Sequence, residues 1–122
     1  MENKKTLVLG ASIHSFRYSY MAIHSLVEKG HTVIAIGRDQ GDVAGVKIQN
    51  KKKPLEEDID TVTMYLNPRN QRDYYNYIIE VKPKRVIFNP GSENPEFYPL
   101  LESHQIKVEE ACTLVLLATN QY

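Results

Sequence analysis

Short apolar runs alternate with segments of helical spacing along this chain of 122 residues. A first run ends at Gly10, and others occupy Thr32–Ile36, Thr61–Leu66 and Arg85–Phe88. These runs are rich in β-branched and aromatic residues, as strands are, and a further short strand is predicted near Ile106–Val108. The sequence therefore predicts at least five strands.

Helices are predicted between the strands. The first opens in the loop after Gly10 and ends at Gly30. The second has Asn67 as N-cap and Pro68 as first residue, and it runs to about Val81 because Pro83 prevents it from going much further. The apolar stripe of this second helix, which we expect to lie on the sheet, comprises Tyr74, Tyr75, Ile78, Ile79 and Val81.

The remaining segments are less regular. Asn94 and Pro95 look like the N-cap and first residue of a third helix, which Pro99 would delay or distort. Residues 39–58 are rich in glycine and charge, so we expect an irregular connection in which only 46–48 forms a short strand. The apolar segment Leu114–Ala118 is either a buried helix or a surface that joins a partner or a second copy of the chain.

Strands that alternate with helices predict a doubly wound α/β fold, a mainly parallel sheet in three α/β/α layers with right-handed crossovers. The length predicts a single domain over residues 1–122. In such folds ligands bind beyond the carboxyl ends of the strands, where the strand order reverses. The loops that follow the strands are Gly10–Arg17, Gly37–Gly41, Asn67–Asn70 and Asn89–Asn94.

The loop Gly10-Ala11-Ser12 is a candidate anion site because it leads into a helix N-terminus, where unpaired amides and the helix dipole favour phosphate. Ser12 can donate its hydroxyl and amide, and Arg17, expected in the first helical turn, can add a charge-assisted contact. The spacing departs from G-x-G-x-x-G, so a plain tight turn remains the alternative. His14 either contacts the phosphate or is simply an exposed loop residue.

The end of the second strand distinguishes between nucleotides. NAD sites place an acidic residue there to accept bonds from the ribose diol, whereas this chain has Gly37-Arg38. An arginine at this position favours a ribose that carries a phosphate, although Asp39 follows and Arg38 could be an ordinary surface cation. The segment Asn89-Pro90-Gly91 either lets a ligand approach the backbone or forms a turn before a helix.

Composition excludes several classes of protein. Lysine plus arginine and aspartate plus glutamate both number 15, so bulk charge gives no reason to expect nucleic acid or an anionic membrane as partner. The basic run 51–53 is interpreted as a solvated loop. Cys112 is the only cysteine, which excludes an internal disulfide and a cysteine-rich zinc site and favours a packed residue over a reactive thiol. No stretch approaches the roughly 20 apolar residues of a membrane span, and the N-terminus is no signal peptide, so a cytoplasmic protein is expected.

Catalysis would need a nucleophile or general base with an orienting partner. The four histidines, His14, His24, His31 and His104, are scattered, and the length leaves no second domain for a substrate. The sequence therefore favours a non-catalytic binding protein over an enzyme, with no metal site.

The chain resembles the small stand-alone CoA-binding proteins, whose Rossmann-like domain is similar to the nucleotide domain of the succinyl-CoA synthetase alpha subunit. The resemblance runs over nearly the whole chain. The residues that carry it are Gly10-Ala11-Ser12, Arg17, Ser19, Gly30, Gly45-Val46-Lys47-Ile48, Asp60-Thr61-Val62, Phe88-Asn89-Pro90-Gly91, Asn94 and Cys112.

This resemblance implies coenzyme A or an acyl-CoA as ligand. It implies that Gly10–Ser12 and Arg17 meet the phosphates, that Arg38 stands near the adenosine end, and that Pro68-Arg69 and Pro90-Gly91 line the rest of the cleft. The complete set of cofactor-binding candidates is Gly10, Ala11, Ser12, Arg17, Ser19, Gly37, Arg38, Pro68, Arg69, Asn89, Pro90, Gly91 and Asn94.

The expected function is non-catalytic binding of CoA or acyl-CoA, as a carrier, a sensor or a regulatory module. One alternative is an NADP-type redox protein that dimerises to complete its site. The other is an interaction scaffold whose nucleotide cleft is vestigial and whose apolar tail joins a partner protein or a second copy.

Overall fold

A seven-stranded sheet runs through the computed structural model of the protein, which describes residues 2–52 and 58–122. In sheet order its strands are β3 (Gly41–Val43), β4 (Val46–Gln49), β2 (Val33–Gly37), β1 (Thr6–Ala11), β5 (Thr61–Met64), β6 (Arg85–Phe88) and β7 (Lys107–Glu110). Neighbouring strands are parallel except for the antiparallel pair β3–β4. From β1 the chain forms β2, β3 and β4 on one side of β1, and it then crosses back to form β5, β6 and β7 on the other side. The strand order therefore reverses beside β1.

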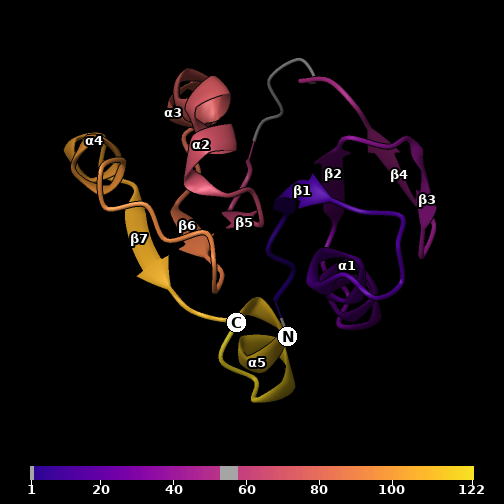
Figure 1. The fold of residues 1–122 in the computed structure, drawn as a ribbon. Helices are drawn as coiled ribbons and strands as arrows, with labels where there is room; N and C mark the ends of the chain where they lie inside the picture. The colour runs from indigo at the N-terminus through magenta and orange to yellow at the C-terminus, as the bar shows by residue number, and fades with distance from the viewer. Residues whose placement is uncertain (1, 53–57) are drawn as a thin grey trace.

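Helices cover both faces of this sheet (Figure 1). On one face lie α1 (Tyr18–Glu28) and α5 (Thr113–Ala118). On the other lie α2 (Pro68–Gln71), the 3₁₀ turn η1 (Arg72–Tyr74), α3 (Tyr75–Val81) and α4 (Tyr98–Ser103). The predicted doubly wound, mainly parallel fold in three layers is confirmed.

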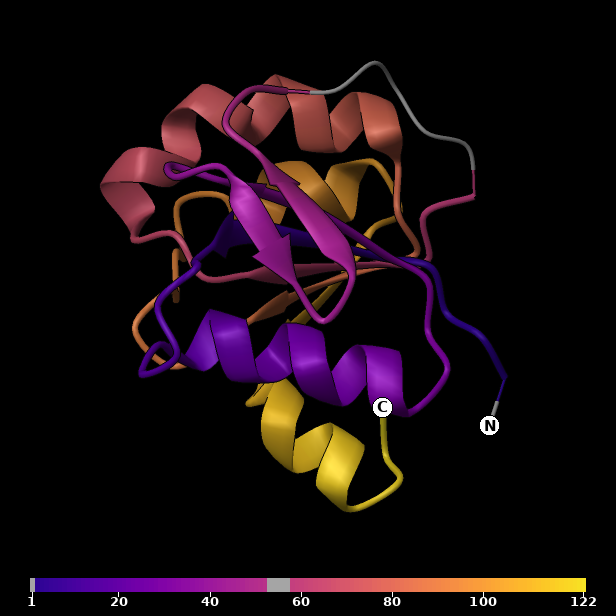
Figure 2. The same ribbon diagram turned by 90° about the vertical axis from the view of Figure 1, so that its right-hand side faces the viewer.

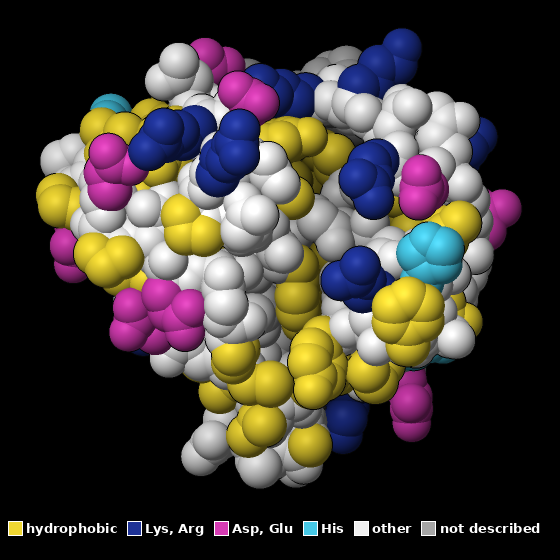
Figure 3. All heavy atoms as spheres, viewed as in Figure 1, with side chains coloured by type: hydrophobic (Ala, Val, Ile, Leu, Met, Phe, Trp, Pro, Cys, Tyr) yellow, Lys and Arg dark blue, Asp and Glu magenta, His cyan; other side chains and the backbone are white. Residues whose placement is uncertain are grey.

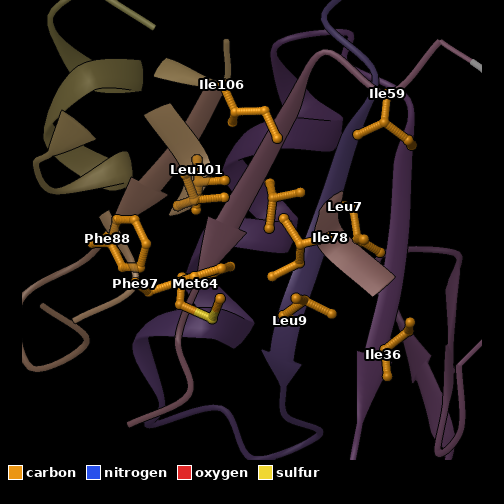
Figure 4. Close-up of a cluster of buried hydrophobic side chains, with 12 residues drawn as sticks. Leu7, Leu9, Ile36, Ile59, Met64, Ile78, Phe88, Phe97, Leu101 and Ile106 are labelled. Carbon is orange, nitrogen blue, oxygen red and sulfur yellow. The ribbon is translucent and has the colours of Figure 1, made fainter. Parts of the chain in front are cut away.

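Strand alternation divides the core between the two faces. In β1, Leu7 and Leu9 point to the face under α3 and α4, whereas Val8 points to the face under α1. The first cluster, which Figure 4 shows, comprises Leu7, Leu9, Ile36, Ile59, Val62, Met64, Ile78, Val86, Phe88, Phe97, Leu101 and Ile106. Each large apolar side chain fully buried in this way contributes roughly 1.5–3 kcal/mol of transfer free energy.

The connection after β2 contains a hairpin that the sequence did not predict. β3 and β4 are joined by Ala44 and Gly45, which both have positive φ, +52° and +80°. Figure 2 shows this hairpin at the sheet edge. The prediction of β4 is confirmed, but β3 was missed because glycine and aspartate are poor strand formers. The predictions for residues 53–57, including Lys53 of the basic run, lie outside the described residues.

The second predicted helix is interrupted. Asn67 does cap it, since its side chain accepts a bond from the amide of Asn70 (2.9 Å). The helical path then passes through η1 before α3 continues to Val81. The predicted stripe packs as expected, with Ile78 buried and the other four residues packed against the same cluster.

The third predicted helix begins later than Asn94-Pro95. α4 starts at Tyr98, and Pro99 stands in its first turn, where a missing N–H costs no helical bond. Asn94 is no helix cap. Its side-chain amide instead donates to Gln71 Oε1 (2.9 Å) and to the Tyr75 hydroxyl (2.7 Å).

The apolar segment near the end of the sequence forms α5, a half-buried helix. Its Leu117 packs in the core cluster under α1, whereas Val115 faces outward. Within residues 2–52 and 58–122, no helix has the length and apolar character that crossing a bilayer requires.

The amino ends of the strands hold a buried polar cluster around Tyr122. Its hydroxyl lies 2.6 Å from Thr6 Oγ1, and the Arg85 guanidinium lies over its ring at 4.6 Å. The ring also contacts His31, whose Nδ1 accepts a bond from the amide of Lys4 (2.9 Å). Burial lowers the pKa of His31, and the charges of Lys4 and Arg85 lower it further.

This cluster predicts a loss of stability in acid. The folded state disfavours protonated His31, so the free energy of unfolding should be highest above the ordinary histidine pKa of about 6.5 and should fall as the pH drops below it. Urea unfolding between about pH 8 and pH 5 measures this dependence. His31→Gln should flatten the slope over that range, whereas His104→Gln, at an exposed site after α4, should leave it unchanged. A slope that persists in His31→Gln would assign it to other groups.

Candidate functional site

Strand β1 ends in a bulge at Gly10. The pairing with β2 runs Leu9 to Ile36 and then Ala11 to Gly37, so Gly10 is the extra residue, with φ +88°. A Cβ at Gly10 would lie 3.0 Å from the backbone of residues 65 and 66. The left-handed conformation and the close contact both require glycine, and the bulge turns the following loop across the end of the sheet.

Gly37 brings the end of β2 against the end of β1. A Cβ there would lie 2.0 Å from the carbonyl oxygen of Ala11, which is well inside contact distance. Only glycine permits this approach, and it places Arg38 beside the loop that follows Ala11. Gly37, which the sequence predicts as a site residue, therefore positions the loop that carries Arg38.

The loop between β1 and α1 ends at Arg17, as the predicted loop Gly10–Arg17 does. α1 begins at Tyr18, and Arg17 is its N-cap instead of a residue of its first turn. The Ser12 hydroxyl accepts a bond from the amide of His14 (3.0 Å), and the His14 carbonyl accepts one from the amide of Arg17 (3.0 Å). No side chain caps α1, and its first turn holds no acidic residue. The N-terminus of α1 is thus open to an anion at the cleft.

The opposite wall comes from the loops after β5 and β6. Strand β5 ends at Met64, earlier than predicted, so Tyr65 and Leu66 belong to the loop. Gln71 ties the two loops together, because its side-chain amide donates to the carbonyls of Leu66 (2.9 Å) and Ser92 (2.7 Å). The sequence analysis missed Gln71, since nothing in the local pattern distinguishes a structural glutamine from a solvated one.

Asn89 is buried beneath this wall. Its side-chain nitrogen donates to Thr63 Oγ1 (2.8 Å) and to the carbonyl of Met64 (2.9 Å), and its oxygen accepts from the amide of Thr113 (2.9 Å). These bonds fix the exit of β6 and the start of α5, and they leave Pro90 and Gly91 to face the cleft.

A cleft of about 580 Å³ opens between these walls, and Figure 3 views the hollow from the carboxyl ends of the strands. Its lining comes from all four predicted loops. The lining residues are Gly10, Ala11, Ser12, His14, Arg17, Tyr18, Ser19, Arg38, Asp39, Tyr65, Leu66, Asn67, Asn70, Pro90, Gly91 and Ser92.

Eight of the thirteen predicted site residues line this cleft. They are Gly10, Ala11, Ser12, Arg17, Ser19, Arg38, Pro90 and Gly91. The other five, Gly37, Pro68, Arg69, Asn89 and Asn94, do not. Gly37, Asn89 and Asn94 support the walls, while Pro68 and Arg69 open α2 beside the lining residues Asn67 and Asn70.

The charged residues of the lining come from the loops after β1 and β2, which form the cationic end of the cleft. Arg17 and Arg38 are its cationic side chains, and Asp39 is its acidic one, 3.8 Å from His14 Nε2. Towards β5 and β6 the lining is uncharged. Burial raises the pKa of Tyr65, so its phenol stays neutral at physiological pH.

The structure keeps the four histidines apart. Only His14 lines the cleft; His24 packs on Tyr20 in α1, His31 lies at the amino ends of the strands, and His104 follows α4. Cys112 is a free, half-buried thiol at the start of α5. Among the described residues, no three histidine, cysteine, aspartate or glutamate side chains gather as metal ligands would.

The family model of the CoA binding domain matches residues 4–118. The chain therefore belongs to the family of CoA-binding domains. No curated protein matches it.

Solved structures share the fold. The crystal structure of an uncharacterized protein matches with TM-score 0.95 and 47% sequence identity, and the match covers 100% of both chains. A hypothetical protein from Pyrococcus horikoshii matches with TM-score 0.79 and 22% identity over 93% of this chain and 80% of its own. Aspartate dehydrogenase from Thermotoga maritima matches with TM-score 0.56 and 18% identity over 88% of this chain and 45% of its own. The two more distant matches show the Rossmann-like fold alone.

The contact between Gly37 and Ala11 predicts a difference between two glycine substitutions. Gly37→Ala should lower the free energy of unfolding by about 3 kcal/mol or more, because the new methyl group meets the backbone of Ala11. This loss is at or above the upper end of the range for substitutions that overpack a core. Gly41→Ala is the matched control, since its Cβ would meet only the end of the Ile13 side chain, at 2.7 Å. Urea unfolding compares the two variants. Equal losses would show that β1 and β2 separate easily.

Proposed function

We propose that the protein binds coenzyme A without catalysing a reaction on it, and that the cleft at the carboxyl ends of the strands is the binding site. The observation that carries the proposal is that Arg17 and Arg38, from the loops after β1 and β2, line the same cleft beside the position where the strand order reverses. Membership of the CoA-binding family supports the choice of ligand.

The diphosphate of the ligand lies on the loop Gly10–Ser12 and at the uncapped N-terminus of α1, with Arg17 as its charged partner. Arg38 contacts the phosphate on the ribose. Because Gly37 holds the Arg38 loop against Ala11, both contacts are available to a single extended ligand.

The pantetheine arm runs along the uncharged wall formed by Leu66, Asn67, Pro90 and Gly91. This arm is neutral and carries two amides, which suits a lining of backbone, asparagine and apolar groups. In this arrangement Asn67 and Asn70 make the contacts that the family resemblance assigns to Pro68 and Arg69.

The non-catalytic part of the proposal rests on the groups around the phosphate loop. The Ser12 hydroxyl is engaged by the backbone amide of His14, and the His14–Asp39 contact is half exposed. Neither arrangement activates a nucleophile. A carrier, a sensor or a regulatory module needs only the binding step.

Thermal unfolding with CoA, acetyl-CoA, dephospho-CoA, NADP, NAD and ATP tests the ligand. CoA at 100 times its dissociation constant should stabilise the fold by about 2.7 kcal/mol. A larger shift with NADP would support the redox alternative. No shift with any of the six would favour a scaffold with a vestigial cleft.

Arg17 is expected to contribute strongly to affinity. Arg17→Ala should cost about 1.5–3 kcal/mol of CoA binding free energy, the range for a hydrogen bond to a charged group. Calorimetric titration measures the loss. Arg72→Ala is the matched control, because Arg72 is an exposed arginine that contacts Glu96 (3.9 Å) outside the cleft lining. An affinity within error of the wild type would remove Arg17 from the site.

Arg38 should distinguish two ligands. Arg38→Ala should weaken CoA more than dephospho-CoA, because only CoA carries the ribose phosphate with which the arginine pairs. Titration of both ligands into both proteins gives the coupling between the side chain and the phosphate. If the two ligands lose equally, Arg38 does not contact that phosphate.

A further inference from the structure

Two aromatic side chains, one in the β1–α1 loop and one at the start of α1, lie open to solvent beside the cleft. Phe16 is 71% exposed and Tyr18 is 70% exposed, and Arg17 stands between them in the chain. Aromatic rings that are exposed beside a cleft are available to a ligand that enters it.

The Phe16 ring is held at the cationic end of the cleft. It stacks on the ring of His14, with 5.6 Å between centroids and 25° between planes. The Arg17 guanidinium carbon lies 5.5 Å from its centre. Since His14 and Arg17 line the cleft and His14 reaches Asp39, next to Arg38, these contacts place the Phe16 ring beside the lining residues, of which it is not itself one.

We propose that Phe16 is the stacking platform for the purine base of the bound nucleotide. The inference rests on the proposed function and names the part of the ligand that this end of the cleft recognises. A base offers a flat π-face, which stacks on an aromatic ring and on a neighbouring guanidinium.

The position of Arg38 selects Phe16 over Tyr18. Base and phosphate are attached to the same ribose ring, so a phosphate held by Arg38 keeps the base within a few ångströms of it. His14 and Phe16 are the rings that contacts connect to Asp39 and so to the position of Arg38, whereas Tyr18, which also lines the cleft, stands at the start of α1. Tyr65 offers no platform because it is mostly buried in the cleft floor, where burial raises its pKa.

Titrations with fragments of the ligand test the platform. Phe16→Ala, Phe16→Leu, Phe16→Tyr and the matched variant Tyr18→Ala are titrated with CoA, adenosine 3′,5′-bisphosphate and 4′-phosphopantetheine. Phe16→Ala should weaken CoA and the adenosine bisphosphate by about 5-fold to 150-fold, the range for one base stacked on an aromatic ring. Phosphopantetheine, which has no base, should bind to this variant as it does to the wild type. Phe16→Tyr should keep the affinity, and Phe16→Leu should lose most of it.

The outcomes separate the two proposals. If the wild type binds neither CoA nor the adenosine bisphosphate, the proposed function and the platform both fail. If the wild type binds CoA but Phe16→Ala has no effect, or weakens phosphopantetheine equally, the CoA site stands and the platform is wrong. A selective loss in Tyr18→Ala alone would place the base on Tyr18 and would also overturn the assignment. Because Phe16 is mostly exposed, its variants should fold, and their melting curves check this.

Discussion

The backbone of Gly37 occupies space beside the Ala11 carbonyl that no side chain can enter, and the cationic end of the cleft depends on this contact. It draws the end of β2 against the end of β1 and so brings Arg38 beside the loop that leads to Arg17. The bulge at Gly10 completes the arrangement, since it turns that loop across the sheet towards β5. Two positions without a Cβ thus bring the loops of Arg17 and Arg38 to one cleft.

The uncharged wall of the cleft is held by amide side chains that the ligand need not touch. Gln71 joins the loops after β5 and β6, and Asn94 donates to Gln71 in turn. Asn89 anchors the exit of β6 to β5 and to α5. Buried amides that satisfy backbone groups on two loops at once fix the spacing of those loops, because breaking any bond leaves a polar group unpaired in the interior. These buried amides therefore fix the width of the cleft.

The two ends of the sheet use positive charge differently. At the carboxyl ends, Arg17 and Arg38 line an open cleft that can accept phosphate. At the amino ends, the Arg85 guanidinium is buried, donates to Thr61 (2.8 Å), pairs with Glu109 (3.3 Å) and lies over the ring of Tyr122. A cation that already has internal partners in the fold stabilises tertiary structure, whereas one that faces a solvent-filled cleft is available for a ligand.

Local sequence determined most of the architecture. Apolar runs defined the principal strands, and with them the edge of the sheet at which a ligand would bind. Capping residues defined the start of the second helix at Pro68. These features depend on near neighbours in the chain. Contacts between distant residues decided the rest. The late start of α4 follows from Asn94 bonding to Gln71 and Tyr75, and the hairpin at β3 forms because β4 supplies its partner.

The same division holds for the site. The sequence located the four loops, the glycines and both arginines, since each stands at the end of a strand or in the loop that follows it. It assigned Asn89 and Asn94 to the ligand, while the fold buries them as supports, and it gave no sign of Gln71 or of the exposed ring of Phe16. Whether a polar or aromatic side chain faces a ligand or the protein depends on which distant loop lies opposite it, and only the tertiary structure decides that.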